Sequence, residues 1–79
     1  RQKRYDEAVP VLEDAVKMAP DNLRARYLLG EALLDKGDAA AALPHLQKVV
    51  LQRPDWQEAR EKLDAALAAT GRGSASKKP

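Results

Sequence analysis

The sequence predicts an all-α protein of about four antiparallel helices, connected as successive helix–turn–helix pairs of a short solenoid. Three observations support this fold class. Apolar residues recur at spacings of three and four, which is the period of an amphipathic helix, and no segment shows the alternation of a strand. Residues that end helices also recur regularly: Pro20 and Pro54, each followed by aspartate, and Gly37 and Gly71.

The first helix is expected over residues 5–18, before Pro20, and the second over residues 23–36, before Gly37. Each of these segments carries an apolar stripe that a packed helix would bury. The stripe of the first helix comprises Val9, Leu12, Ala15, Val16 and Ala19. The stripe of the second helix comprises Ala25, Leu28, Leu29, Ala32 and Leu33.

Asp38 is a suitable N-cap for a third helix over residues 39–52. The segment "DWQE", from Asp55 to Glu58, predicts a capping box for a fourth helix that runs to about Ala69. The buried stripe of the third helix comprises Ala39, Ala42, Leu43, Leu46, Val49 and Val50. The remaining segment, "GRGSASKKP", has too few apolar groups to order itself and is expected to be a flexible basic tail.

The chain repeats itself with a period of 34 residues. The pairs of identical residues that share this offset include Pro10 and Pro44, Leu12 and Leu46, Val16 and Val50, Pro20 and Pro54, Asp21 and Asp55, Leu29 and Leu63, Leu33 and Leu67, and Gly37 and Gly71. Because the helix-ending residues repeat together with the apolar ones, the period belongs to a helix–turn–helix unit.

Residues 23–56 resemble one complete tetratricopeptide repeat. The family pattern is matched by identical residues at Leu29, Gly30, Ala42 and Pro54, and by apolar substitutes at Leu33, Leu46 and Val49. Arg26 stands where the family has a tryptophan. The resemblance divides the chain into the second helix of a truncated repeat (1–22), a complete repeat (23–56), the first, capping helix of a following repeat (57–71) and the basic tail (72–79). It implies a C-terminal fragment of a longer protein of this family, and the missing initial methionine agrees with that.

Gly30 lies inside the second predicted helix, where glycine costs about 1 kcal/mol relative to alanine. Two antiparallel helices approach each other most closely where the side chains at the contact are small. We therefore expect Gly30 to face Ala42 on the third helix. In the fourth helix the equivalent position is Asp64, which suits a terminal helix with a polar outer face.

The distribution of charge argues against nucleic-acid binding. The net charge of +2 includes six basic residues at the two ends of the chain, whereas residues 5–71 contain eight basic and twelve acidic residues. Such an acidic body lacks the clustered lysine and arginine that phosphate contacts need. Contact of the basic tail with RNA or an acidic lipid surface remains an alternative. No apolar run approaches the roughly 18 residues of a membrane span, so none is expected.

The residue types that carry catalysis are few and scattered. The sequence has no cysteine, His45 is its one histidine, and Ser74 and Ser76 lie in the tail. The carboxylates are spread along helix faces and first turns, where they suit solvent and the helix dipole. We therefore predict no catalytic residue, no metal site and no cofactor, and a chain that is not an enzyme.

By the resemblance, function is expected in a concave groove lined by the first helices of successive repeats. In this family such a groove holds a peptide or a partner helix, which implies a protein–protein interaction or scaffold module. The implied groove residues are Arg24, Tyr27, Glu31, Leu34, Asp35, Glu58 and Glu61. Their acidic groups favour a partner segment with lysine or arginine beside an apolar side chain, and the basic tail could imitate such a segment. In the alternative interpretation Tyr27 and Leu34 pack against the neighbouring helix and the acids only keep the surface soluble.

A second hypothesis is a structural spacer or self-association element without a ligand of its own. The first helix lacks the partner helix of its own repeat, so only residues 23–36 are available to cover Val9, Leu12 and Val16. An exposed apolar strip favours pairing with a second copy, so concentration-dependent self-association is expected. The sequence specifies neither the partner nor the compartment.

Overall fold

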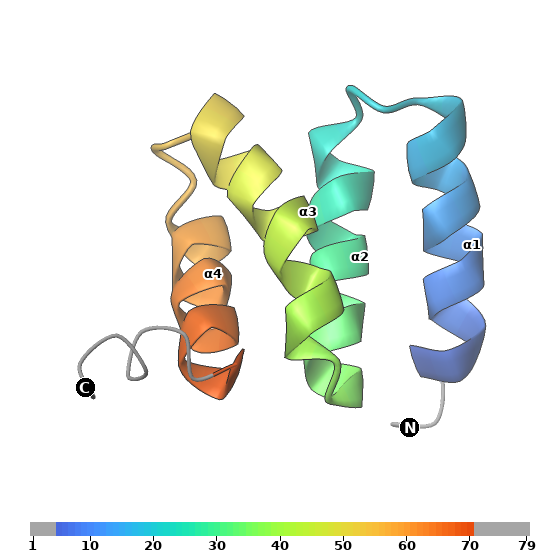
Figure 1. Ribbon diagram of the computed structural model, residues 1–79. Coiled ribbons are helices and arrows are strands. Elements are labelled where there is room, and N and C mark those ends of the chain that lie inside the picture. Colours follow the sequence, from blue (N-terminus) through green and yellow to red (C-terminus); the bar gives the residue numbers. More distant parts are fainter. Residues whose placement is uncertain (1–4, 71–79) are drawn as a thin grey trace.

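The computed structural model describes residues 5–70, which form four helices of 14 residues each (Figure 1). They are α1 (Tyr5–Met18), α2 (Leu23–Lys36), α3 (Ala39–Gln52) and α4 (Gln57–Thr70). Each helix runs antiparallel to the preceding one, and α1 and α4 lie on opposite sides of the molecule with α2 and α3 between them. The predicted all-α fold and its four helices are confirmed. The last helix ends at Thr70, close to the predicted end at about Ala69, and Gly71, which was expected to stop it, lies outside the described residues.

Both central helices begin at a residue whose side chain caps the helix, and α2 ends at a glycine. Asn22 caps α2, because its side chain accepts a hydrogen bond from the backbone N–H of Ala25 at 3.1 Å. Asp38 caps α3 in the same way, accepting from the N–H of Ala41 at 3.3 Å. Gly37 ends α2 with a φ of 100°, a left-handed conformation that favours glycine.

The predicted capping box of α4 is wrong. The helix begins at Gln57, so that Trp56, and not Asp55, occupies the N-cap position. The carboxylate of Asp55 instead lies 3.7 Å from Nε of Arg53. An indole offers no acceptor oxygen, so α4 lacks the kind of side-chain cap that Asn22 gives to α2.

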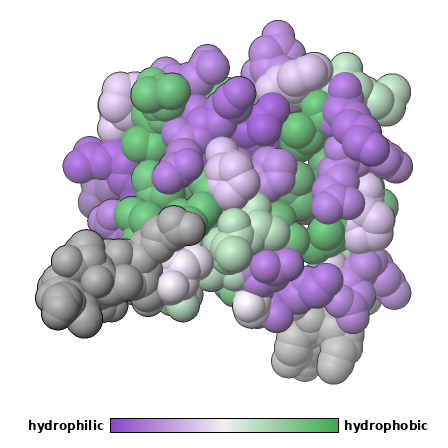
Figure 2. All heavy atoms as spheres, viewed as in Figure 1, coloured by the Kyte–Doolittle hydropathy of each residue, from purple (hydrophilic) through white to green (hydrophobic). Residues whose placement is uncertain are grey.

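The core lies between α2 and α3 and extends to one face of each outer helix. Its largest fully buried side chains are Leu29, Leu46 and Val49. On the side from which Figure 2 is seen, apolar patches lie among hydrophilic side chains. The expected burial of Leu28 is wrong: this residue is 39% exposed. Leu28 lies about 100° around the helix from Leu29, which places it at the edge of the buried stripe.

Gly30 lies at the close approach of α2 and α3, as predicted, but its nearest neighbour is Leu46 rather than Ala42. A Cβ atom built on Gly30 would lie 2.7 Å from both Cγ and Cδ2 of Leu46, closer than van der Waals contact allows. Leu46 is itself fully buried, and a close-packed interior leaves such a side chain little room to move. Sequence spacing identified the correct face of α3 and missed the residue by one turn, because residues four apart share a helix face.

Arg26 is half-buried and connects three segments of the chain. Its Nη2 donates to the carbonyl oxygen of Pro20 at 3.0 Å, and its Nη1 lies 3.5 Å from Nδ1 of His45 on α3. Arginine has no acceptor, so the second contact is a hydrogen bond only when His45 is neutral and carries its proton on Nε2. Polar links therefore hold the start of α2 where the family pattern has an apolar indole.

Acidification is expected to destabilise the fold through His45. Burial lowers the pKa of His45 and the charge of Arg26 lowers it further, while Glu13 opposes both. Glu13 and Lys17 of α1 line the same hollow as His45. Because the pKa of His45 in the folded chain lies below its ordinary value of 6.5, the stabilisation that neutral His45 provides is complete above pH 6.5. It is lost as the pH falls through the pKa of the folded state.

Urea denaturation between about pH 7.5 and about pH 5.5, the range in which histidine titrates, measures this effect. The free energy of unfolding should decrease more in the wild type than in His45→Gln, which retains an acceptor but does not titrate. The carboxylates are the same in both proteins, so their contribution cancels. An equal decrease in the two proteins would contradict the role of His45.

Candidate functional site

The predicted groove residues lie on α2 and α4, and we call the surface that they form the α2–α4 face. The structure leaves four of them exposed and three half-buried. The exposed residues are Arg24, Asp35, Glu58 and Glu61, and the half-buried ones are Tyr27, Glu31 and Leu34. The face therefore combines accessible charges with partly covered apolar side chains.

Tyr27 packs against Trp56, which the sequence analysis did not assign to the groove. The two ring centroids are 4.7 Å apart and the ring planes are tilted by 35°, a usual arrangement of an aromatic pair. Trp56 directly precedes α4, the helix that supplies Glu58 and Glu61. Its place directly before this helix was the feature of the sequence that could have assigned Trp56 to the groove. The pair joins α2 to the start of α4 and places a large half-exposed ring at the edge of the α2–α4 face.

Glu31 is paired with Lys62, a second residue that the sequence analysis missed. Nζ of Lys62 lies 3.3 Å from Oε2 of Glu31, and each side chain is about one third exposed. Burial alone would lower the pKa of Lys62, but the hydrogen bond and charge of Glu31 outweigh it and raise this pKa. Lys62 therefore neutralises the charge of Glu31 within the protein. The carboxylates of this face that have no ion-pair partner belong to other residues.

The groups of the α2–α4 face are close enough to influence one another electrostatically. Burial raises the pKa of the Tyr27 hydroxyl, and the charges of Glu31, Glu58 and Glu61 add to this rise while Lys62 opposes it. The structure thus brings groove residues of both helices around one phenol. Since Glu31 is paired, Glu58 and Glu61 are the acids acting on Tyr27 that have no ion-pair partner, and both are exposed.

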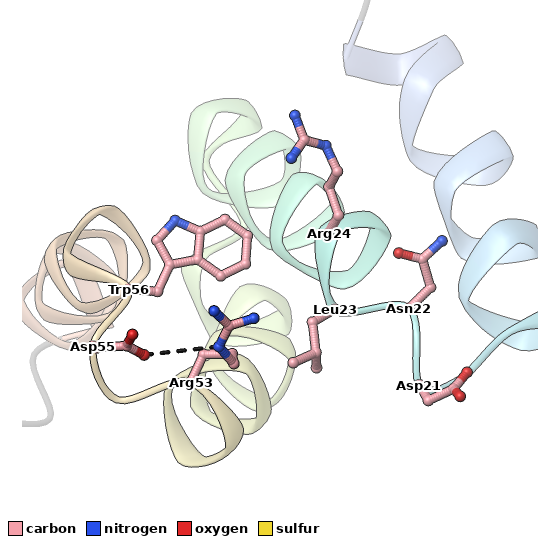
Figure 3. A pocket seen from close by; sticks show the side chains of 7 residues that line it. All are labelled: Asp21, Asn22, Leu23, Arg24, Arg53, Asp55 and Trp56. Atoms are coloured by element: carbon pink, nitrogen blue, oxygen red, sulfur yellow. Dashed lines mark ion pairs between the residues drawn. The ribbon is translucent and has the colours of Figure 1, made fainter.

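A hollow of about 550 Å³ adjoins Trp56 where the α1–α2 turn, the start of α2 and the end of α3 meet (Figure 3). It is lined by Asp21, Asn22, Leu23, Arg24, Arg53, Asp55 and Trp56. In Figure 3 the indole extends toward α2 and lies beside the ion pair of Arg53 with Asp55. Two arginines and two aspartates balance in charge here, so the hollow is neutral whereas the adjoining α2–α4 face is acidic.

The part of the chain that the structure describes, residues 5–70, contains no group of three or more histidine or acidic side chains that could hold a metal ion. None of its helices is long and apolar enough to cross a membrane. Ser74, Ser76 and the predicted docking of the basic tail lie outside the described residues.

A second uncovered surface lies on the outer side of α1. Val11 and Met18 are 67% and 85% exposed. Val11 also lines an open hollow together with Glu7, Ala8 and Leu12. Val9, Leu12 and Val16 were expected to be insufficiently covered, but Val9 and Val16 are buried and Leu12 is half-buried. The exposed apolar surface of α1 is therefore formed mainly by Val11 and Met18, and not by the residues that were expected.

Comparison with known proteins gives two matches. The family model described as tetratricopeptide repeat matches residues 1–69. The chain is also 38% identical over 60 residues to the TPR repeat-containing protein PA0015 of Pseudomonas aeruginosa. That alignment covers 76% of this chain and 57% of the relative, so the chain spans little more than half of the relative's length. No solved structure matches the chain.

Proposed function

Because the chain belongs to the tetratricopeptide repeat family, whose repeats generally mediate protein–protein interaction, we propose that its α2–α4 face binds a segment of a partner protein. The family is typically a non-enzymatic interaction module. The observation that supports this site is the aromatic pair of Tyr27 and Trp56 beside the exposed acids Glu58 and Glu61. Partly exposed aromatic rings are common centres of binding energy in interfaces.

The charge of the face indicates the chemistry of the partner. Glu31 is occupied by Lys62, so the acidic charge available to a ligand comes from Asp35, Glu58 and Glu61, and it exceeds the one positive charge of Arg24 on this face. A segment with lysine or arginine next to an apolar side chain would complement these acids and pack on the aromatic pair. The charges would contribute mainly to the rate of approach and to register, and the aromatic contact mainly to affinity.

Two short synthetic peptides test this proposal: one of alternating lysine and leucine, and a matched one of alternating glutamate and leucine. Trp56 is the only tryptophan of the sequence, so its fluorescence reports directly on the proposed site. The lysine peptide should change the emission and bind more tightly at low salt than at high salt, because salt screens exposed charges. Tighter binding of the glutamate peptide would contradict the assigned partner chemistry.

Variants of the α2–α4 face give the corresponding prediction for its residues. Tyr27→Ala should weaken binding of the lysine peptide about tenfold or more at both salt concentrations. Glu58→Lys should weaken it chiefly at low salt. Glu13→Lys is the matched control, because it makes the same charge change at an exposed position of α1. Thermal melts must accompany Tyr27→Ala, since this variant also removes a contact between α2 and α4.

The pattern across these variants decides the location of the site. Equal weakening by Glu13→Lys and Glu58→Lys would reveal an effect of net charge alone. Unchanged binding in Tyr27→Ala and Glu58→Lys would place the binding surface away from the α2–α4 face.

A second candidate function is self-association through the outer side of α1, favoured by the exposure of Val11 and Met18. The apparent mass of the wild type in sedimentation should rise with concentration, and Val11→Glu should reduce that rise because it buries a charge in the contact. Leu51→Glu is the matched control: Leu51 is 80% exposed but lies on α3. A monomeric wild type at about millimolar concentration, where even weak contacts associate, would exclude this function.

A further inference from the structure

The hollow of about 550 Å³ beside Trp56 has no part in the binding proposed above, yet it adjoins the α2–α4 face. Arg24 lines the hollow and also belongs to that face, and Trp56 stands at the boundary between the two. Pockets for small ligands usually measure about 300–1,000 Å³, so this hollow is large enough for one side chain. A segment bound on the face could therefore place a side chain in it.

Apolar groups line the hollow on both sides of Arg53. The indole of Trp56 is half-exposed although it pairs with Tyr27, so part of its ring is still accessible. Leu23, the first residue of α2, is also half-buried. Figure 3 shows the guanidinium of Arg53 between this indole and Leu23, and all three groups line the same hollow. The hollow thus combines two apolar groups with a flat cation.

The charges of the hollow disfavour an ion as its occupant. A lysine or arginine side chain would meet the cations Arg24 and Arg53, and a carboxylate would meet Asp21 and Asp55. An uncharged aromatic ring avoids both repulsions. Such a ring can stack on the indole of Trp56, and its negative π face attracts a guanidinium such as that of Arg53.

We propose that this hollow binds an uncharged aromatic side chain of the partner segment. The proposal rests on the α2–α4 face holding that segment, and it adds a requirement to the partner chemistry given above. Next to its lysine or arginine residues, the segment carries a phenylalanine, tyrosine or tryptophan that enters between Trp56, Leu23 and Arg53. The ring selects among basic segments, because an aliphatic side chain gains neither the aromatic pairing nor the cation–π contact.

Three series of peptides derived from the lysine peptide test this proposal with the 79-residue chain. One leucine at a time is replaced by phenylalanine, by glutamate, or by cyclohexylalanine, which has a ring without π electrons. Binding is followed by the emission of Trp56, since none of these residues emits in the tryptophan range. At the best position, phenylalanine should bind about two- to tenfold more tightly than cyclohexylalanine, the usual gain of an aromatic pair beyond its buried area.

The variant Arg53→Gln connects this preference to the hollow. It removes a guanidinium from the lining, so the ratio of the phenylalanine and cyclohexylalanine affinities should fall. Lys48→Gln is the matched control, because it makes the same charge change at an exposed position of α3 outside the hollow, and it should keep the ratio. The ratio compares two peptides of equal charge on one protein, so an effect of net charge cancels.

A small neutral probe distinguishes failure of this proposal from failure of the α2–α4 proposal. N-acetylphenylalanine amide carries no charge and needs no acidic face, so it should perturb Trp56 more than N-acetylcyclohexylalanine amide does, and Arg53→Gln should reduce the difference. This result without binding of the lysine peptide would refute the α2–α4 proposal and support the aromatic site.

Three results would overturn the aromatic site. The first is binding of the lysine peptide with no preference for phenylalanine over cyclohexylalanine in either the peptides or the small amides. The second is tighter binding of the glutamate peptide than of the phenylalanine peptide, which would identify a carboxylate as the occupant. The third is a ratio that Arg53→Gln leaves unchanged.

Discussion

Replacement of Gly30 by leucine is expected to lower the free energy of unfolding by about 1–3 kcal/mol, the usual cost of overpacking a filled core. The added side chain would enter the space of Leu46, which is fully buried and in contact range of any Cβ at position 30. Gly30→Ala should also destabilise, but less, because the gain in helix propensity of about 1 kcal/mol opposes the overlap. Urea denaturation followed by circular dichroism measures both effects.

A double substitution separates the overlap from helix propensity. Leu46→Ala should by itself cost about 2–5 kcal/mol, because it leaves a cavity. In that background the overlap at position 30 is gone, so Gly30→Ala should raise stability instead of lowering it. Where Leu46→Ala is too unstable to give a transition, the return of a cooperative transition on adding Gly30→Ala gives the same information. A loss of stability from Gly30→Ala in both backgrounds would contradict the assigned contact.

Introduction of aspartate at Ala66 is expected to have a similarly large effect on the attachment of α4. Ala66 is 0% exposed and belongs to the hydrophobic core, whereas its neighbour Ala65 is exposed. An unpaired charge at Ala66 should cost about 3–5 kcal/mol, as when a buried ion pair loses one partner. The matched variant Ala65→Asp should stay within about 0.5 kcal/mol of the wild type, as exposed substitutions do.

The same pair of variants links stability to the proposed site. Release of α4 would remove Trp56, Glu58 and Glu61 from the neighbourhood of Tyr27, so Ala66→Asp should also lose binding of the lysine peptide. Ala65→Asp should retain it. Equal stability of the two variants in urea would show that α4 is not held through Ala66.

The local features of the fold could be predicted because they depend on residues close together in the sequence. Apolar spacing and helix-ending residues such as Gly37 identified all four helices. The need for small side chains where two antiparallel helices approach closely explained why a glycine stands at position 30. The capping box was wrongly predicted because the sequence allows either Asp55 or Trp56 to stand directly before the helix. In the structure Trp56 holds that position, and Asp55 pairs with Arg53.

The details of the site depend on contacts between helices and could not be read from spacing. Tyr27 was correctly placed on a helix face, but its packing on Trp56 depends on how α4 crosses α2. Likewise, Glu31 was counted as a free acid because nothing in the local sequence indicates its pairing with Lys62. Helical period determines which residues share a face, whereas the rotation and crossing of the helices determine which residues meet.

The position of Trp56 has a practical consequence for following the unfolding of this chain. Its ring contacts Tyr27 at the junction of α2 and α4, and it stands before a helix without a side-chain cap. In a linear array of helices each unit is held mainly by its neighbours, so an end helix can separate while the rest stays folded. Tryptophan emission therefore follows the docking of α4, whereas ellipticity follows all four helices. An emission transition that precedes the ellipticity transition would mark an array that unravels from this end rather than a single two-state unit.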